Sequence, residues 1–247
     1  NNYEVVPSQN TISFDVKEAQ SKYDACELGG EIEIPLSVEE PEVTTEKLKS
    51  NLFTTELASY STTGGGSEGR RTNISLAVKS CNGVILLPGE TFSYNDVLGE
   101  RTADKGYQPA GAYSDGEVVE QLGGGICQVS STLFAAVLHT DLEIVTRANH
   151  SMPVSYLPMG MDATVSWGGP EFKFKNNFSY PIKISASYSG GTINFKILGA
   201  ASDKKKIEVE VKKTGEMSAE TYRKYYDENG NVTSTKRVAR SNYKPHS

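Results

Sequence analysis

The chain has 247 residues, of which 37% are hydrophobic, 9% aromatic and 23% charged, and its formal net charge is -6. This composition is typical of a globular protein and excludes a disordered chain, and the dispersed lysines and arginines argue against a nucleic-acid-binding surface. No run of about 18 uncharged apolar residues is present, so no membrane-spanning helix is predicted.

The start of the sequence carries no methionine, no basic stretch and no apolar stretch of the kind found in export signals. We therefore expect the sequence to begin inside a longer chain. Any export signal or membrane anchor is then expected in the segment that precedes it.

The first part of the sequence, residues 1–55, is predicted to be the trailing part of a small α+β unit. Apolar and polar residues alternate over 11–16 and 31–36, which is typical of strands. Helices are expected over 17–28, before a Gly-Gly pair, and over 45–52.

A main domain is predicted over 56–200. Near its start, the polar, glycine-rich stretch 61–69 is typical of a flexible linker. Apolar residues spaced along one helix face then predict a helix over 70–82, and the same spacing predicts a second helix over 127–139.

Strands are predicted for most of the remaining sequence, which ends in a C-terminal β extension or partial β module over 201–247. The expected strands are 84–87, 117–121, 142–145, 164–167, 172–174, 181–188, 192–198 and 207–211, followed by a hairpin around Asn229-Gly230. We predict an α+β fold with mostly antiparallel strands and two or three packed helices.

Cysteine and histidine are scarce, with three of each. Cys26 and Cys81 lie on predicted apolar helix faces and are expected to be buried core thiols. No spacing of these residues is typical of a metal site, and no sequence pattern indicates a cofactor.

The strongest local signal is Gly123-Gly124-Gly125 just before Cys127 at the predicted start of a helix. A helix N-terminus lowers the pKa of a cysteine, and its free amides can bind an oxyanion. We assign Cys127 as a candidate nucleophile and place candidate oxyanion donors at the backbone of Gly124, Gly125, Ile126 and Gln128. The alternative is a tight glycine turn followed by a buried structural cysteine.

A nucleophilic cysteine needs a base within hydrogen-bond reach. His139 lies about 18 Å from Cys127 along the same helix, at 1.5 Å per residue, and His246 lies at the C-terminus. His150 follows a strand that is able to return the chain toward Cys127, so it is the candidate base.

A third group usually orients the imidazole, and spacing does not choose between Asn149, Ser151 and Asp162. Arg147 is either a bidentate ligand for a substrate carboxylate or a member of a surface ion pair. The side chains assigned to a substrate site are Arg147, Tyr156 and Trp167.

Five ordered blocks of the sequence resemble the VanW domain family. They are Leu-Pro-Gly-Glu-Thr-Phe-Ser-Tyr-Asn at 87–95, Gly-Tyr at 106–107, Gly-Gly-Gly-Ile-Cys-Gln-Val-Ser-Ser-Thr-Leu at 123–133, the stretch 147–156 with Arg147 and His150, and Gly-Met-Asp-Ala-Thr-Val at 160–165. The residues before these blocks resemble the end of a peptidoglycan-binding domain that often precedes VanW domains. The C-terminal hairpin resembles a small β module that often follows them.

The resemblance implies L,D-transpeptidase activity on the peptidoglycan of Gram-positive bacteria. Cys127 then matches the family's nucleophile and His150 its base, with supporting roles for Arg147, Ser151 and Asp162. The implied partners are donor and acceptor stem peptides, with carbapenem-type β-lactams as covalent inhibitors and no nucleic acid, metal or cofactor. We expect an extracellular, wall-associated, membrane-anchored monomer. The alternatives are a cysteine endopeptidase or amidase of peptidoglycan and a non-catalytic wall-binding module.

Overall fold

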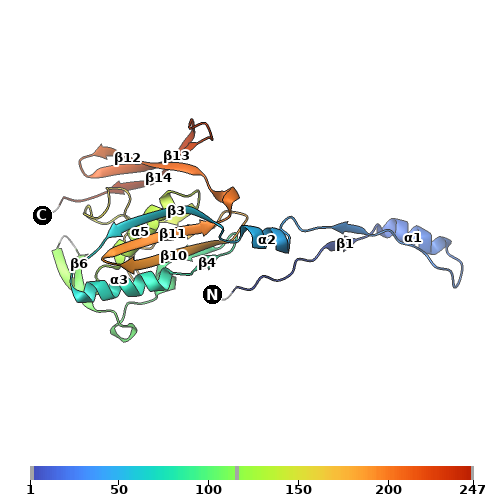
Figure 1. Ribbon diagram of the computed structural model, residues 1–247, viewed down its shortest axis with the longest axis horizontal. Coiled ribbons are helices and arrows are strands. Elements are labelled where there is room, and N and C mark those ends of the chain that lie inside the picture. Colours follow the sequence, from blue (N-terminus) through green and yellow to red (C-terminus); the bar gives the residue numbers. More distant parts are fainter. Residues whose placement is uncertain (1–2, 115–116, 246–247) are drawn as a thin grey trace. The chain divides into compact units, whose positions relative to one another are not determined.

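The computed structural model describes residues 3–114 and 117–245, so His246 lies outside the described residues. It contains two compact units, one that ends at Ser50 and one that begins at Asn51. The fold is α+β, and every strand pair in it is antiparallel, which confirms the predicted class (Figure 1). Five α-helices occur among the described residues.

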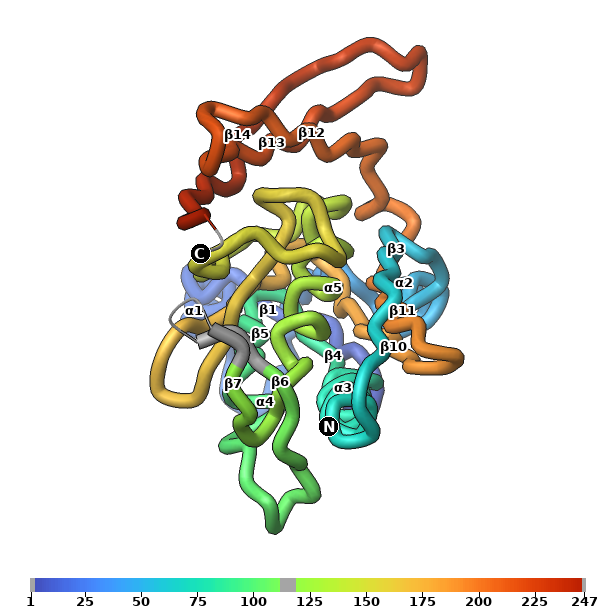
Figure 2. The backbone as a smooth tube through the Cα atoms, turned by 90° about the vertical axis from the view of Figure 1, so that its left-hand side faces the viewer, coloured from blue at the N-terminus to red at the C-terminus, as the bar shows by residue number. Residues whose placement is uncertain are grey.

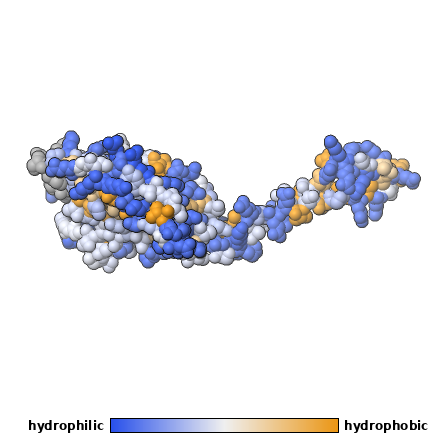
Figure 3. Space-filling model, turned by 90° about the horizontal axis from the view of Figure 1, so that it is seen from above, coloured by the Kyte–Doolittle hydropathy of each residue, from blue (hydrophilic) through white to orange (hydrophobic). Residues whose placement is uncertain are grey.

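The N-terminal unit is small and exposes much of its apolar surface. It contains β1 (Thr11–Ser13), α1 (Val16–Ala25), β2 (Ser37–Glu39) and most of α2 (Thr45–Asn51). Apolar side chains on the surface of this unit are visible in Figure 3, and Ile12, Leu36 and Val38 are each more than half exposed. The strand predicted over 31–36 is wrong, because the chain pairs only from residue 37 onward. Cys26 is partly exposed, so its predicted burial is also wrong.

A four-stranded sheet forms the frame of the second unit. Its strands lie in the order β3 (Thr55–Thr63), β11 (Thr192–Gly199), β10 (Ile182–Ser189) and β4 (Ile85–Leu86). One face of this sheet carries Ile184, Ile193, Phe195 and Ile197, which are fully buried. The two long helices, α3 (Glu68–Cys81) and α5 (Ile126–Leu138), lie side by side on that face (Figure 2).

Helix α5 is a core helix rather than a surface helix. Every residue from Gln128 to Leu138 is buried, which is typical of a helix with packing partners all round. A second sheet, β5 (Thr91–Ser93), β9 (Lys173–Lys175) and β8 (Glu143–Thr146), is joined to it through Phe172, whose ring lies 5.4 Å from that of Phe134. Burial on all sides fixes the position of α5, and with it the position of Cys127.

The C-terminal residues form a three-stranded sheet that belongs to the same compact unit. Its strands are β12 (Lys206–Gly215), β13 (Ser218–Tyr226) and β14 (Val232–Asn242). The buried guanidinium of Arg223 in β13 donates hydrogen bonds of 2.9 Å to the carbonyl oxygens of Val137, Leu138 and Leu142. Arg223 thus satisfies carbonyl groups at the C-terminus of α5, where a positive charge is favourable.

Two predicted features of the main domain differ from the structure. The stretch 61–69 is not a free linker, because β3 continues through Thr63 and Gly64 lies against the side chain of Gln128. The strand predicted over 164–167 is reduced to one bridge between Ala148 and Thr164.

Two further parts of the unit contact α3. They are α4 (Tyr94–Leu98) and a hairpin of β6 (Pro109–Ser114) and β7 (Glu117–Leu122). Within the described ranges, no helix has the length and hydrophobicity needed to cross a bilayer.

Candidate active site

A cleft of about 750 Å³ opens at the N-terminal end of α5. Its walls come from stretches that are distant in the sequence. They are 121–128, His150 with 154–156, 164–167, and the residues Arg70, Glu100, Arg101 and Gly111.

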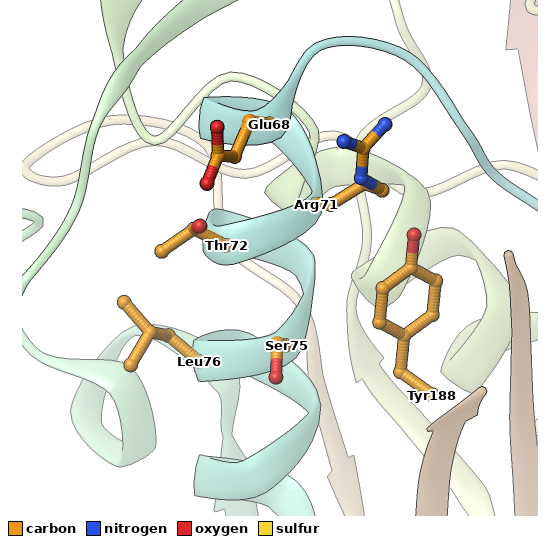
Figure 4. Close-up of a pocket in the computed structure, with 6 residues that line it drawn as sticks. All are labelled: Glu68, Arg71, Thr72, Ser75, Leu76 and Tyr188. Carbon is orange, nitrogen blue, oxygen red and sulfur yellow. The ribbon is translucent and has the colours of Figure 1, made fainter. Parts of the chain in front are cut away.

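A second hollow of about 450 Å³ lies along α3. Figure 4 shows Arg71 and Ser75 of this helix beside Tyr188 of β10. Neither cysteine nor histidine lines this hollow. The cleft beside α5 is therefore the candidate active site.

The glycine run forms the turn that delivers Cys127 to the cleft. Gly123 and Gly125 have φ angles of +85° and +105°, which favour glycine. A Cβ on Gly124 would lie 2.4 Å from the carbonyl oxygen of Ala110. The buried amide of Asn73 donates to the carbonyl oxygen of Gly124 at 3.0 Å. Three glycines are required because two positions need positive φ angles and one has no room for a side chain.

We expect Gly124→Ala to destabilise the fold by about 2–3 kcal/mol, because the new methyl group collides with backbone that cannot move aside. It should also displace the start of α5 and lower any activity of Cys127. Gly65→Ala is the matched control, since no atom lies within 4 Å of its Cβ position and its φ is not positive. Urea unfolding measures both variants, and equal stability of the two would contradict this account of the turn.

Cys127 and His150 line this cleft, and the buried carboxylate of Asp162 contacts His150. Cys127 is the second residue of α5 and is partly exposed. The Nδ1 atom of His150 lies 2.7 Å from Oδ2 of Asp162, and the backbone N–H of His150 donates to the same oxygen at 2.7 Å. Since Nδ1 faces Asp162, Nε2 is the ring nitrogen left to interact with Cys127, whose Sγ lies 3.3 Å from the carbonyl oxygen of Val165 and 3.7 Å from the hydroxyl of Thr164.

The pKa values of the two reacting groups shift in opposite directions. Burial disfavours the thiolate of Cys127, but the hydrogen bond and charge of His150 outweigh it, so the pKa of Cys127 is lowered. Burial also disfavours the imidazolium, but Asp162 and Cys127 raise the pKa of His150 to about 9. These opposite shifts both favour a thiolate–imidazolium pair, which is the reactive form of a cysteine nucleophile.

This pair predicts an unusual pH dependence of alkylation. In a Cys26→Ser background, we expect iodoacetamide to modify Cys127 rapidly and to leave Cys81 unmodified, because Cys81 is fully buried and burial raises its thiol pKa. Because the pKa of Cys127 is lowered, its alkylation rate should fall less steeply with decreasing pH than that of an ordinary thiol. A rate that falls about tenfold per pH unit, as for an ordinary thiol of pKa about 8.5, would contradict the ion pair.

The backbone N–H groups around Cys127 differ in whether they already donate a hydrogen bond. The N–H groups of Gly124, Ile126 and Gln128 donate to the carbonyl oxygens of Gln121, Gly123 and Gly125. Among the described residues, no hydrogen-bond partner is present for the N–H groups of Gly125 and Cys127. Of the predicted donors, only Gly125 therefore keeps a free amide, and Cys127 adds its own.

The predicted substrate residues divide into two groups. Tyr156 and Trp167 line the cleft, and Trp167 is 52% exposed. Burial raises the pKa of Tyr156, so its hydroxyl stays protonated. Ser151 is exposed and does not line the cleft.

Arg147 is also absent from the cleft, because its guanidinium is already occupied. It donates from Nε to the carbonyl oxygen of Asp162 at 2.6 Å and from Nη2 to Oδ1 of Asp162 at 3.0 Å. Its side chain is only 4% exposed. This pairing holds the carboxylate of Asp162 in place and leaves no donor fork for a substrate carboxylate.

Sequence reasoning missed three residues that shape the site. Asn73 holds the glycine turn, Arg70 supplies a positive charge to the cleft, and Tyr243 donates to Asp162. Arg70 and Asn73 are one helical turn apart on α3, but nothing in their spacing distinguishes them from other polar helix residues. Tyr243 lies in a polar tail without any motif.

No metal site is evident in the parts of the chain that the structure describes, where no three His, Cys, Asp or Glu side chains gather in a suitable arrangement.

Residues 69–198, just over half of the chain, match the family model described as VanW like protein. The chain is 47% identical over 163 residues to the uncharacterized protein YoaR of Bacillus subtilis (strain 168), which covers 66% of this chain and 54% of that protein. It is 35% identical over 135 residues to the vancomycin B-type resistance protein VanW of Enterococcus faecalis (strain ATCC 700802 / V583), which covers 51% of this chain and 49% of that protein.

The chain thus spans about half the length of these two relatives. No solved structure matches it. The family match includes the glycine turn, Cys127, His150 and Asp162, and it confirms the resemblance found in the sequence. The chain belongs to the VanW-like family.

Proposed function

We propose that this protein is a cysteine L,D-transpeptidase that joins peptidoglycan stem peptides at the outer face of the cell. The observation that carries the proposal is the presence of Cys127 and His150 in one open cleft, with the imidazole of His150 paired to the carboxylate of Asp162. Nucleophile, base and orienting carboxylate in this order are the parts of an acyl-transfer site. The relative named as a vancomycin resistance protein supports a role at the cell wall.

In the first half-reaction, the Cys127 thiolate attacks the carbonyl carbon that joins the L-centre of the third stem residue to a terminal D-residue. A carbon–sulfur bond forms, the carbon–nitrogen bond breaks, and the leaving amine takes its proton from the His150 imidazolium. The N–H groups of Gly125 and Cys127 are suited to bind the oxyanion of the intermediate. The product is a thioester on Cys127 and a free D-amino acid.

In the second half-reaction, the amine of a neighbouring stem attacks the thioester. Neutral His150 accepts the proton of that amine, the new amide forms, and the carbon–sulfur bond breaks. This returns the thiolate–imidazolium pair that Asp162 stabilises. Water in place of the amine gives carboxypeptidase activity from the same intermediate.

A carboxylate of the donor peptide is the group that we expect Arg70 to bind. Its Nη2 donates to Oε1 of Gln128 at 2.8 Å, and Nε2 of Gln128 donates to Thr62 and to the carbonyl oxygen of Thr63. Because Gln128 is buried and held at both ends, it fixes the guanidinium at the cleft wall. This assigns to Arg70 the role that the sequence suggested for Arg147.

We expect Arg70→Gln to raise KM for a tetrapeptide donor about tenfold or more, through loss of a charge-assisted hydrogen bond. Arg71→Gln is the matched control, because Arg71 is the neighbouring arginine and faces the second hollow. Steady-state kinetics on both variants make the comparison. An equal effect of the two substitutions would remove Arg70 from substrate binding.

Product analysis tests the proposed reaction. Purified protein is incubated with a tetrapeptide donor and an amine-bearing acceptor stem, and the products are separated and weighed by mass spectrometry. The proposal expects joined stems together with free D-amino acid. Free D-amino acid alone would indicate a hydrolase, and an unchanged donor would contradict both enzymatic alternatives and favour a wall-binding module.

A further inference from the structure

Tyr243 reaches the candidate triad from outside the family match. It follows directly after β14, whereas the match ends at residue 198. Its hydroxyl lies 2.5 Å from Oδ1 of Asp162 and accepts a hydrogen bond of 2.7 Å from the backbone N–H of Gly160. Tyr243 is 7% exposed and the Asp162 side chain 1% exposed, so water does not compete for these contacts.

The carboxylate of Asp162 is bound at both oxygens. Oδ2 accepts from the backbone N–H of His150 and faces its Nδ1, while Oδ1 accepts from Arg147 and from Tyr243. The phenol must be the donor to Asp162, since an ionised carboxylate only accepts. Tyr243 and Arg147 together fix the rotation of this carboxylate, and that rotation decides where Oδ2 meets the imidazole.

The same end of the chain fastens the segment that carries His150. Lys244 donates its backbone N–H to the carbonyl oxygen of Ser151 at 2.7 Å. Asn149 donates to the carbonyl oxygen of Asn242, and Arg147 donates to the hydroxyl of Ser241, both at 2.7 Å. Residues on both sides of His150 are thus held by residues 241–244.

We propose that Tyr243 is a positioning residue that acts through Asp162 on His150, so that the C-terminal sheet is a working part of the candidate active site. The inference rests on the proposed function for the identity of the reaction. The contacts of Tyr243, Asp162 and His150 do not depend on which reaction the site performs.

The test compares Tyr243→Phe with Tyr225→Phe. Both variants lose one tyrosine–aspartate hydrogen bond between the C-terminal sheet and the rest of the unit, because the hydroxyl of Tyr225 in β13 donates to Asp141 at 2.7 Å. Asp141 takes no part in the pairing of His150 with Asp162, so Tyr225→Phe removes a comparable tyrosine–aspartate hydrogen bond without touching that pair. The phenyl ring stays in both cases.

Two readouts separate a positioning role from a structural one. The first is the pKa of His150, followed by NMR through its Cε1–H signal in a chain with only three histidines. The second is the rate of acyl transfer from a tetrapeptide donor. Tyr243→Phe should shift the pKa of His150 from about 9, because the carboxylate that pairs with the imidazolium loses a hydrogen-bond donor that fixes its rotation. It should also lower kcat about tenfold or more, and Tyr225→Phe should change neither.

The outcomes are distinguishable from those that test the proposed function. A shifted pKa of His150 in Tyr243→Phe, in a wild type that does not process stem peptides, would support the positioning role and remove only the proposed reaction. An unchanged pKa in Tyr243→Phe, or the same change in both variants, would overturn the inference. If Tyr243→Phe does not fold, the Tyr243 hydroxyl is needed for stability, and this result would also overturn the inference.

Discussion

Replacement of Cys127 with alanine is expected to abolish acyl transfer, with a loss on the order of 10⁴-fold or more, as for other nucleophiles that act as a unit with their base. The reason is that Cys127 is the thiol that lines the cleft, whereas Cys81 is fully buried. Turnover of a tetrapeptide donor, measured by release of the D-amino acid, provides the assay.

The fold should survive this change, because the Cys127 side chain is only partly buried and alanine suits a helix. Cys26→Ser is the control and should keep full activity. Substantial turnover by Cys127→Ala with an unchanged melting temperature would show that another group performs the reaction.

Asp162→Asn should affect both rate and stability. The amide would place a donor against either the imidazole or the guanidinium of Arg147, so His150 loses its orientation and its charge partner. Loss of this carboxylate in a triad costs on the order of 10³- to 10⁴-fold in kcat. Loss of one partner of a buried ion pair costs about 3 kcal/mol or more.

The stability difference should depend on pH in a defined direction. Burial alone would raise the pKa of Asp162, but the hydrogen bond with His150 and the charge of Arg147 lower it below the ordinary 3.8. The advantage of the wild type is therefore present at neutral pH and shrinks as the pH falls through that lowered value. Urea unfolding at neutral and acidic pH measures it.

Asp141→Asn is the matched control for this prediction, because Asp141 accepts from Tyr225 and has no part in the triad. It should keep kcat. If Asp162→Asn retained wild-type kcat, or if both variants lost it equally, the assignment of Asp162 as the orienting carboxylate would be wrong.

The sequence was most informative where a local pattern dictates a local structure. The apolar spacing over 127–139 predicts a helix that the structure places at Ile126–Leu138, and the glycine run before it marks a turn that only glycine can make. The sequence also predicted His150 near Cys127, on the expectation of a strand that returns the chain, and β8 (Glu143–Thr146) does precede His150. These inferences needed only short-range geometry.

The features of the site that the sequence did not predict depend on contacts between residues that are distant in the sequence. Asp162 was one of three candidates, and its selection requires the bridge between Ala148 and Thr164 that brings it beside His150. Arg147 has the charge of a carboxylate ligand, but only the folded chain shows that the carboxylate it binds is Asp162. No spacing rule connects Tyr243 with a residue 81 positions earlier.

The fold of the stretch 61–69 also depends on contacts with distant residues. Its glycines and serines are typical of a linker, yet Thr62 is buried and its hydroxyl lies 2.7 Å from that of Thr132 on α5. Pairing with β11 supplies the hydrogen bonds that turn a polar stretch into a strand. Composition describes what a segment prefers when alone, and a neighbouring strand overrides that preference.

The most direct test of this account is the covalent intermediate. The protein is mixed with a tetrapeptide donor in the absence of an acceptor, quenched in acid, and weighed intact before peptide mapping. We predict one acyl group per chain, attached to Cys127, absent from Cys127→Ala and released by added amine. Consumption of the donor without any adduct on Cys127, or an adduct on another residue, would contradict the assignment of Cys127 as the nucleophile.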